Sequence, residues 1–300
     1  MLRIFHSDRF VPQLPAGHRF PIDKYGLIRE QLLYEGSVDA HMLVESEPIA
    51  EEHILALHTP QYWEAVKKLE VLPRAMRKIG FPQSSSLVDR SRRSVNGTFE
   101  SALWALKHGI GMNIAGGTHH AYRERGEGFC LLNDIAISAT YLLKQKWVKQ
   151  ILIVDLDVHQ GNGNAYIFQS EPAVFTFSMH GKDNYPLHKE ISDLDIALAT
   201  DTGDQAYLDT LSQQLPDLIQ QLKPDLIYFQ AGVDILETDR LGKLSLSREA
   251  CKERDKRVLQ LCRNSDVPVV ICIGGGYSEK ISDTVEAHSN TFRQAISLFA

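Results

Sequence analysis

Five short apolar runs, separated by longer segments with helical spacing, constrain the fold of this chain more than any other feature. The runs are 109–116, 150–156, 173–179, 225–231 and 268–273, with RIFH near the start as a weaker candidate. The helical segments are about 84–107, 132–146, 204–222, 247–264 and 278–298. Continuous apolar runs are typical of parallel strands covered on both faces, and strand–helix alternation implies βαβ crossovers. We therefore predict an α/β fold with a doubly wound, mostly parallel sheet flanked by helices.

The composition predicts one globular domain spanning residues 1–300. Apolar residues make up 43% and charged residues 23% of the chain, which is enough apolar surface for a large core. No repeat, low-complexity tract or Gly/Ser/Pro-rich linker divides it. The formal net charge is −6 and no Lys/Arg block stands out, which argues against electrostatic binding of nucleic acid.

The cysteines and the N-terminus predict a cytoplasmic protein. Four cysteines are spread over the chain without a CxxC pair, which favours reduced thiols in a reducing compartment. The first residues lack the apolar core of a signal peptide, and no stretch approaches 18 apolar residues, so we expect no membrane contact. The sequence leaves the oligomeric state open.

Polar side chains gather just after four of the predicted strands, where each strand reaches its carboxyl end. These residues are His119, His120, Asp157, His159, Asp234 and Tyr277. The carboxyl ends of parallel strands meet at one edge of the sheet, and ligand crevices form at that edge. The sequence therefore predicts one site built from four loops.

The Asp155-Leu-Asp157-Val-His159 run is the sharpest signal for a metal. Period-2 alternation would point its three polar side chains the same way, and a Zn²⁺ ion would explain why they converge. Asp234 completes a set of three ligands, which leaves a coordination position open for catalysis. An alternative interpretation makes the two aspartates caps of the following helix and Asp234 a simple turn residue.

Two further motifs predict acid/base and oxyanion chemistry. One of the adjacent imidazoles His119 and His120 would deprotonate the attacking water, and the pair would protonate the departing amine. Asp155 and Asn162 are available to give the two rings different environments. Tyr277 would donate a hydrogen bond to the developing oxyanion, and the preceding glycines would let the backbone approach closely. The alternatives are two surface histidines and a packed ring after a tight turn.

Six motifs resemble those of the histone deacetylase superfamily in order and approximate spacing. They are GGTHHA, GFCLLND, DLDVHQGNG, FSMHG, QAGVDILETDRLG and GGGY. The resemblance covers about residues 110–280 strongly and the HRFPIDKYGLIRE stretch more loosely. HQGNG and DILETDRLG are most similar to the class IV branch and its bacterial relatives. The resemblance implies an arginase/deacetylase-type fold and a zinc-dependent deacetylase or deacylase that acts on linear amides.

The resemblance also implies a role for each site residue. His120 would be the main proton-transfer residue, with His119 as its electrostatic or acid partner, oriented by Asp155. Tyr277 would polarise the substrate carbonyl. Asn162 would face His120 where some branches have Asp, so that the imidazolium is stabilised less. One catalytic Zn²⁺ would be bound by Asp157, His159 and Asp234.

A structural K⁺ and an acyl tunnel follow from the same resemblance. The K⁺ would be contacted by oxygens of Asp155, Asp157, His159, Ser178 and Met179. Gly128 and Phe129 would line the tunnel, with Tyr185 as an opposing aromatic wall. The family's rim aspartate, which grips a peptide backbone, has no evident counterpart in 72–95.

Several functional alternatives remain at this stage. Acyl-lysine in proteins is the expected substrate, and an acetylpolyamine or another small acyl-amine is the alternative. Fe²⁺ would suit the same N/O ligands as Zn²⁺. An arginase-like dimanganese ureohydrolase shares the fold but needs more Asp/His ligands, and Glu237 and Asp239 lie far along the loop. A binding protein with an inactive pocket is disfavoured because every residue that the chemistry requires is present.

Overall fold

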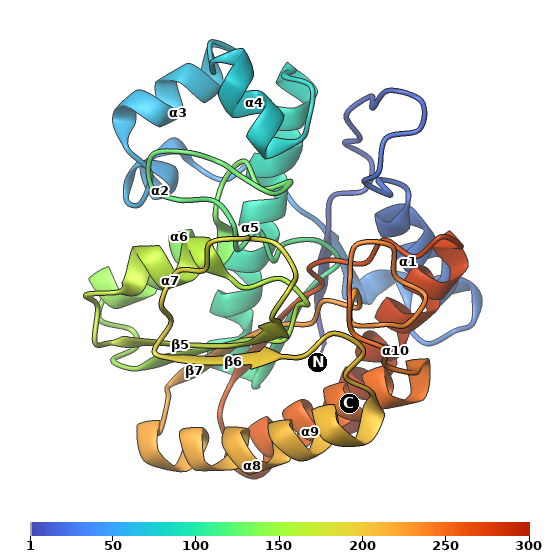
Figure 1. Cartoon of the computed structure of the whole chain (residues 1–300). Coiled ribbons are helices and arrows are strands. Elements are labelled where there is room, and N and C mark those ends of the chain that lie inside the picture. The colour runs from blue at the N-terminus through green and yellow to red at the C-terminus, as the bar shows by residue number, and fades with distance from the viewer. Residues whose placement is uncertain (1) are drawn as a thin grey trace.

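One sheet of eight parallel strands forms the centre of the molecule, and the computed structural model describes residues 2–300 (Figure 1). The strand order is β2 (Leu43–Glu45), β1 (Ile4–His6), β3 (Ile110–Asn113), β8 (Val269–Cys272), β7 (Leu226–Gln230), β4 (Ile151–Asp155), β5 (Val174–Gly181) and β6 (Leu194–Leu198). Every pairing is parallel. The predicted doubly wound parallel sheet is confirmed, and each predicted run corresponds to one strand, with β5 extending two residues past the predicted 173–179. The short strands β2 and β6 at the two edges were not predicted.

Helices cover both faces of this sheet (Figure 1). They are α1 (Lys24–Tyr34), α2 (Glu51–Leu55), α3 (Pro60–Lys67), α4 (Pro73–Ile79), α5 (Ser85–His108), α6 (Asp134–Lys144), α7 (Asn162–Phe168), α8 (Asp204–Leu222), α9 (Arg248–Asn264) and α10 (Ile281–Phe299), with a 3₁₀ turn at Ala40–Met42. The five predicted helices correspond to α5, α6, α8, α9 and α10. Side-chain caps fix several starts: the Ser84 hydroxyl accepts from Leu87 N at α5, and the Ser247 hydroxyl accepts from Ala250 N at α9.

Two hydrophobic cores lie on opposite faces of the sheet. In β4, Leu152 and Val154 belong to the core beneath α8, α9 and α10, whereas Ile151 and Ile153 belong to the core beneath α5 and α6. Burial on both faces is the reason why this strand reads as a continuous apolar run instead of an alternating one. Among residues 2–300, no helix is long and apolar enough to cross a membrane.

The strand order brings the predicted site loops together. Strands β3, β8, β7 and β4 are consecutive neighbours in the sheet, although they are far apart along the chain. All of them are parallel, so the loops that follow them leave from the same edge. These four loops carry the histidine pair, the glycine run with Tyr277, Asp234, and the Asp157–His159 segment.

Candidate active site

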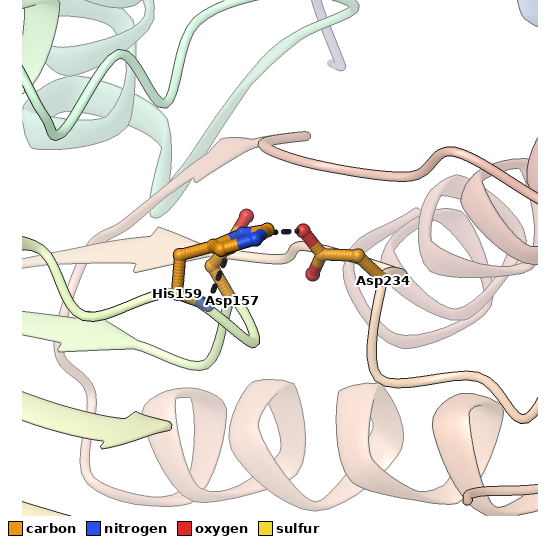
Figure 2. Close-up of side chains that lie close together, drawn as sticks. All are labelled: Asp157, His159 and Asp234. Atoms are coloured by element: carbon orange, nitrogen blue, oxygen red, sulfur yellow. Dashed lines mark hydrogen bonds and ion pairs between the residues drawn. The ribbon is translucent and has the colours of Figure 1, made fainter. Parts of the chain in front are cut away.

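A cluster of two carboxylates and one imidazole lies at the carboxyl edge of the sheet (Figure 2). The Nδ1 atom of His159 lies 2.9 Å from Oδ1 of Asp157 and 3.1 Å from Oδ2 of Asp234. Strand β4 ends at Asp155, so the alternation expected to align 155, 157 and 159 does not extend to the last two. A bend replaces it, held by the His159 amide donating to Asp157 Oδ1 at 2.9 Å and the Val158 amide donating to Asp234 Oδ1 at 2.9 Å.

This cluster has the composition and the shape of a site for a divalent metal ion. One ligand atom from each of Asp157, His159 and Asp234 lies within 4.8 Å of the others, and all three residues are buried. Oδ2 of Asp234 is buried and accepts no well-aligned hydrogen bond, although Nδ1 of His159 lies 3.1 Å away, and such an oxygen is costly unless another group satisfies it. A cation on these N/O ligands would satisfy that oxygen and balance the two carboxylates.

Charges within the cluster shift the pKa of each member. Burial raises the pKa of Asp234, and the neighbouring Asp157 raises it further. Burial also disfavours the charged form of Asp157, but the charges of His119 and His159 hold its pKa well below the ordinary value. Burial lowers the pKa of His159, yet the two carboxylates outweigh burial and raise it to about 10. In the absence of a metal ion, a proton on the His159 imidazole would offset part of the negative charge of Asp157 and Asp234.

The glycines around the cluster permit close approach of the backbone. The Gly275 amide donates to Oδ2 of Asp157 at 2.7 Å. A Cβ atom at Gly275 would lie 1.9 Å from Oδ2 of Asp234, and one at Gly232 would lie 2.4 Å from Oδ2 of Asp157. The glycine run is therefore more than a tight turn, because any side chain there would displace the carboxylates.

The two adjacent imidazoles have different partners. Nδ1 of His119 lies 2.7 Å from Oδ2 of Asp155, and Nδ1 of His120 lies 2.5 Å from Oδ1 of Asn162. Burial lowers the pKa of His119, but Asp155 and Asp157 outweigh it and raise the pKa. Burial and the charges of His119 and His159 place the pKa of His120 well below the ordinary value. The environments thus favour the charged form of His119 and the neutral form of His120, and neither histidine is a surface residue.

A cavity of about 370 Å³ leads from the surface to these groups. Its inner end is formed by His120, His159 and Tyr277, and its wall includes Gly128, Phe129 and Tyr185. The ring of Tyr185 lies 5.0 Å from the ring of His120 at an interplanar angle of 88°. Burial and the nearby carboxylates raise the pKa of Tyr277 well above its ordinary value, so its hydroxyl stays protonated and can donate. The three residues expected to line an acyl tunnel thus share one cavity wall, and the use of this cavity as an acyl tunnel stays a prediction.

Two buried cations near the site were not predicted from the sequence. Lys24 is 0% exposed, and its Nζ donates to the Gly274 carbonyl at 2.9 Å. Burial lowers the pKa of Lys24 to about 8, although Asp234 and other carboxylates raise it. Arg90 lines an inner cavity, stacks 4.2 Å from the centre of the Tyr25 ring, and has no hydrogen bond at Nη1. Lys24 lies in the loosely matching N-terminal stretch, whereas no motif pointed to Arg90.

The two loop carboxylates judged too far along the chain to be assumed ligands of a second metal do not join the cluster. Oδ2 of Asp239 accepts from the Tyr277 amide at 2.6 Å, and its Oδ1 accepts from the Leu241 and Gly242 amides at 2.8 and 2.9 Å. Glu237 is exposed. Within residues 2–300, the only group of three or more His, Cys, Asp or Glu side chains with ligand atoms this close is the one containing Asp234. This arrangement does not favour a dimetal site.

Of the expected potassium ligands, Asp155, Ser178 and Met179 lie on the neighbouring strands β4 and β5. Asp157 and His159 lie in the bend that follows β4. Asp155 of β4 pairs in register with Ser178 of β5, and the Ser178 hydroxyl lies 3.0 Å from Nδ1 of His180. Both Ser178 and Met179 are buried. The potassium site itself stays a prediction.

The fold and this site together define a class of protein, and comparisons with known proteins name the family. Residues 18–292 match the histone deacetylase domain. An uncharacterised protein of Picosynechococcus sp. is 42% identical over 292 residues, which are 97% of each chain. Histone deacetylase 2 of Arabidopsis thaliana is 29% identical over 293 residues, which are 93% of this chain and 75% of that protein. The crystal structure of an HDAC homologue from Aquifex aeolicus has a TM-score of 0.84 at 22% identity, over 99% of this chain and 84% of that one.

The chain belongs to the histone deacetylase family, as its motifs implied. It is therefore a deacetylase-family amidohydrolase with a buried Asp-His-Asp cluster able to hold a metal ion.

Proposed function

We propose that the protein is a zinc-dependent deacylase that hydrolyses the acyl amide of acyl-lysine side chains. The observation that carries this proposal is the juxtaposition of the buried Asp157–His159–Asp234 cluster with His120 at the inner end of a cavity. The adjacent His119 has a pKa shifted in the opposite direction from that of His120. An N/O ligand set of this kind suits Zn²⁺, which when bound would polarise the amide carbonyl and the attacking water as a Lewis acid.

The side chains around the cluster can carry out the proton transfers of amide hydrolysis. Neutral His120, with Nδ1 held by Asn162, would accept a proton from the attacking water at Nε2. The imidazolium of His119 would stabilise the negative charge that develops nearby. The Tyr277 hydroxyl would donate to the carbonyl oxygen. As the C–N bond breaks, the proton on His120 would pass to the amine nitrogen, and the products are a carboxylic acid and a free amine.

Several finer assignments belong to this proposal. The chain would be one catalytic domain of the class IV branch, on the strength of HQGNG and DILETDRLG. It would bind K⁺ through Asp155 and neighbouring oxygens. All four cysteines are buried and free, which fits a reducing compartment, and we assign the protein to the cytoplasm. An acetylpolyamine is the alternative substrate.

A panel of substrates tests the proposed activity. The protein loaded with one equivalent of Zn²⁺ is offered acetyl- to myristoyl-lysine peptides beside acetylpolyamines, and the release of free amine is measured. We expect hydrolysis of at least one acyl-lysine peptide by the wild type and its loss in His120→Ala, whereas His41→Ala, which alters an exposed histidine, retains it. No hydrolysis of any substrate by the zinc-loaded protein, or full activity of His120→Ala, would contradict the proposal.

A further inference from the structure

The mouth of the catalytic cavity is positively charged. Four cationic side chains line it, and all of them are exposed: Arg19, Arg77, Lys78 and Lys243. Asp183 is the single carboxylate side chain in the same lining. The cations come from three separate segments, namely the loop before α1, the end of α4 and the loop between β7 and α9. The sequence alone did not indicate this cluster, because its members come from separate segments and form no Lys/Arg block.

These cations are only weakly neutralised by the protein. Among residues 2–300, no carboxylate oxygen lies within 4 Å of Arg19 or Arg77, since neither takes part in an ion pair. Lys243 donates at 2.9 Å to the backbone carbonyl of Asp183, which carries no net charge. Lys78 lies 3.6 Å from a carboxylate oxygen of Glu127.

The two carboxylates near these cations, Glu127 and Asp183, also interact with other side chains. Glu127 accepts a hydrogen bond from the Tyr185 hydroxyl at 3.0 Å and also lies 3.6 Å from Arg125. The Asp183 carboxylate accepts from the Thr200 hydroxyl at 2.9 Å. The mouth therefore keeps a positive local potential although the whole chain has a net charge of −6. Screening limits such a field to about 10 Å at moderate salt, so it acts on a bound substrate more than on a distant one.

The cavity fixes which part of a substrate meets this charge. The amide must reach His120 and Tyr277 at the inner end, and the extended lysine side chain would occupy the wall lined by Gly128 and Phe129. The groups flanking the acylated lysine then lie among the exposed cations at the mouth. Basic neighbours or the free ammonium groups of a polyamine would be repelled there, and carboxylates would be attracted.

We propose that the mouth formed by Arg19, Arg77, Lys78 and Lys243 selects acyl-lysine substrates that carry carboxylate groups beside the acylated residue. This inference rests on the proposed deacylase function and narrows its substrate class. It disfavours the acetylpolyamine alternative and lysine-rich peptides. A carboxylate here could come from acidic side chains on either side of the acyl-lysine or from its own α-carboxylate, and the chemistry of recognition is the same.

The test compares three peptides that share one acyl-lysine and differ only in flanking Asp, Ser or Lys residues. Both kcat/KM and the dissociation constant are measured, the latter by calorimetry on His120→Ala. We expect the Asp peptide to be preferred over the Lys peptide by roughly tenfold in both quantities at low salt, with the gap closing near about 0.5 M salt. A free acyl-lysine compared with its carboxamide reports separately on the α-carboxylate.

Charge reversal at the mouth provides the variants. Arg77→Glu combined with Lys243→Glu should abolish or invert the order of the peptides. Arg74→Glu makes the same change at an exposed position of α4 outside the cavity and should keep the wild-type order. Equal affinities for the three peptides, the reverse order, or no measurable binding by any of them would overturn the inference. Binding in the expected order without hydrolysis would support the charge selection while refuting the deacylase activity.

Discussion

The side-chain amide of Asn162 fixes the tautomer of His120. Its Oδ1 lies 2.5 Å from Nδ1 of the ring, while its Nδ2 donates to the Tyr122 hydroxyl at 2.9 Å. That hydroxyl in turn donates to Glu190 at 3.1 Å, so the amide cannot rotate without losing a bond. Because an amide oxygen only accepts, Nδ1 carries the hydrogen and Nε2 has the lone pair that a general base requires.

Replacing Asn162 by Asp should make His120 easier to protonate. A carboxylate in place of the amide stabilises the imidazolium and raises the low pKa of His120. The neutral form is then lost at a higher pH as the solution is acidified. The acidic limb of the kcat/KM profile should therefore move up by about 1–2 pH units.

The measurement is a pH–rate profile on one acyl-lysine peptide for the wild type, Asn162→Asp and Asn264→Asp. Asn264 is exposed at the end of α9, so its variant should follow the wild-type curve. An acidic limb of Asn162→Asp that coincides with that of the wild type would show that His120 is not the group that must be neutral.

Removing the hydroxyl of Tyr277 should affect turnover more than binding. In the proposed mechanism the hydroxyl donates to a charge that develops only during the reaction, and the loss of one such donor typically costs about 10²–10³ in kcat. The ring packs 5.9 Å from that of Phe129, and Phe preserves this contact. We expect Tyr277→Phe to have a much lower kcat, with KM and metal content near those of the wild type. A kcat within about twofold of the wild type would remove Tyr277 from the proposed mechanism.

The content of divalent metal, counted apart from the proposed K⁺, should be one ion per chain. Asp157, His159 and Asp234 supply a single set of ligands, while Asp239 is engaged by three backbone amides. Exhaustive chelation should abolish hydrolysis, and one equivalent of Zn²⁺ should restore it. Asp234→Asn should lose stoichiometric binding, because it removes a charged ligand, whereas Glu237→Gln should still bind one ion. Two equivalents in the wild type, measured by elemental analysis, would instead favour a ureohydrolase-like dimetal centre.

The central strands of the sheet could be predicted from the sequence because they are buried on both faces. In β4, for example, residues on both faces of the strand belong to a hydrophobic core. The sequence of such a strand is a continuous apolar run, whereas a strand with one exposed face alternates between apolar and polar residues. Parallel pairing then places their following loops at one edge, so the meeting of Asp157 and Asp234 follows from topology. The alternation argument for His159 was wrong in its geometry, because the strand ends four residues earlier and a bend brings the ring to the cluster.

The elements that the sequence missed share a different property. Strand β6 alternates between half-buried and exposed residues, and α2 and α4 are only 5 and 7 residues long, so their hydrophobic periods are too short to recognise. Lys24 reaches the site from a stretch that matches the family only loosely, and Arg77 reaches it from a segment without a chemical motif. Only the folded chain shows that such cations lie beside the catalytic cavity, since long-range contacts leave no local pattern.

A buried guanidinium connects the two loops that carry the carboxylates of the candidate metal site. Nη1 of Arg254, which projects from α9, donates to the Gly232 carbonyl at 2.6 Å and to the Leu156 carbonyl at 3.2 Å. Gly232 precedes Asp234 by two residues, and Leu156 directly precedes Asp157. Nε of Arg254 also donates to Asp255 at 2.8 Å, and both residues are 0% exposed. Arg254 is therefore a positioning residue that should influence both metal affinity and stability.

Arg254→Met should lower the free energy of unfolding by about 3–5 kcal/mol, because it leaves Asp255 charged and unpaired in the core. Metal affinity should fall as well, because both carbonyls lose their donor. Arg257→Met lies one turn further along α9, where the side chain is partly exposed, and should cost under about 1 kcal/mol. The double variant Arg254→Met/Asp255→Leu should regain much of the stability without regaining the metal affinity. Urea unfolding and zinc titration measure the two effects separately, and a double variant with wild-type zinc affinity would show that Arg254 acts through stability alone.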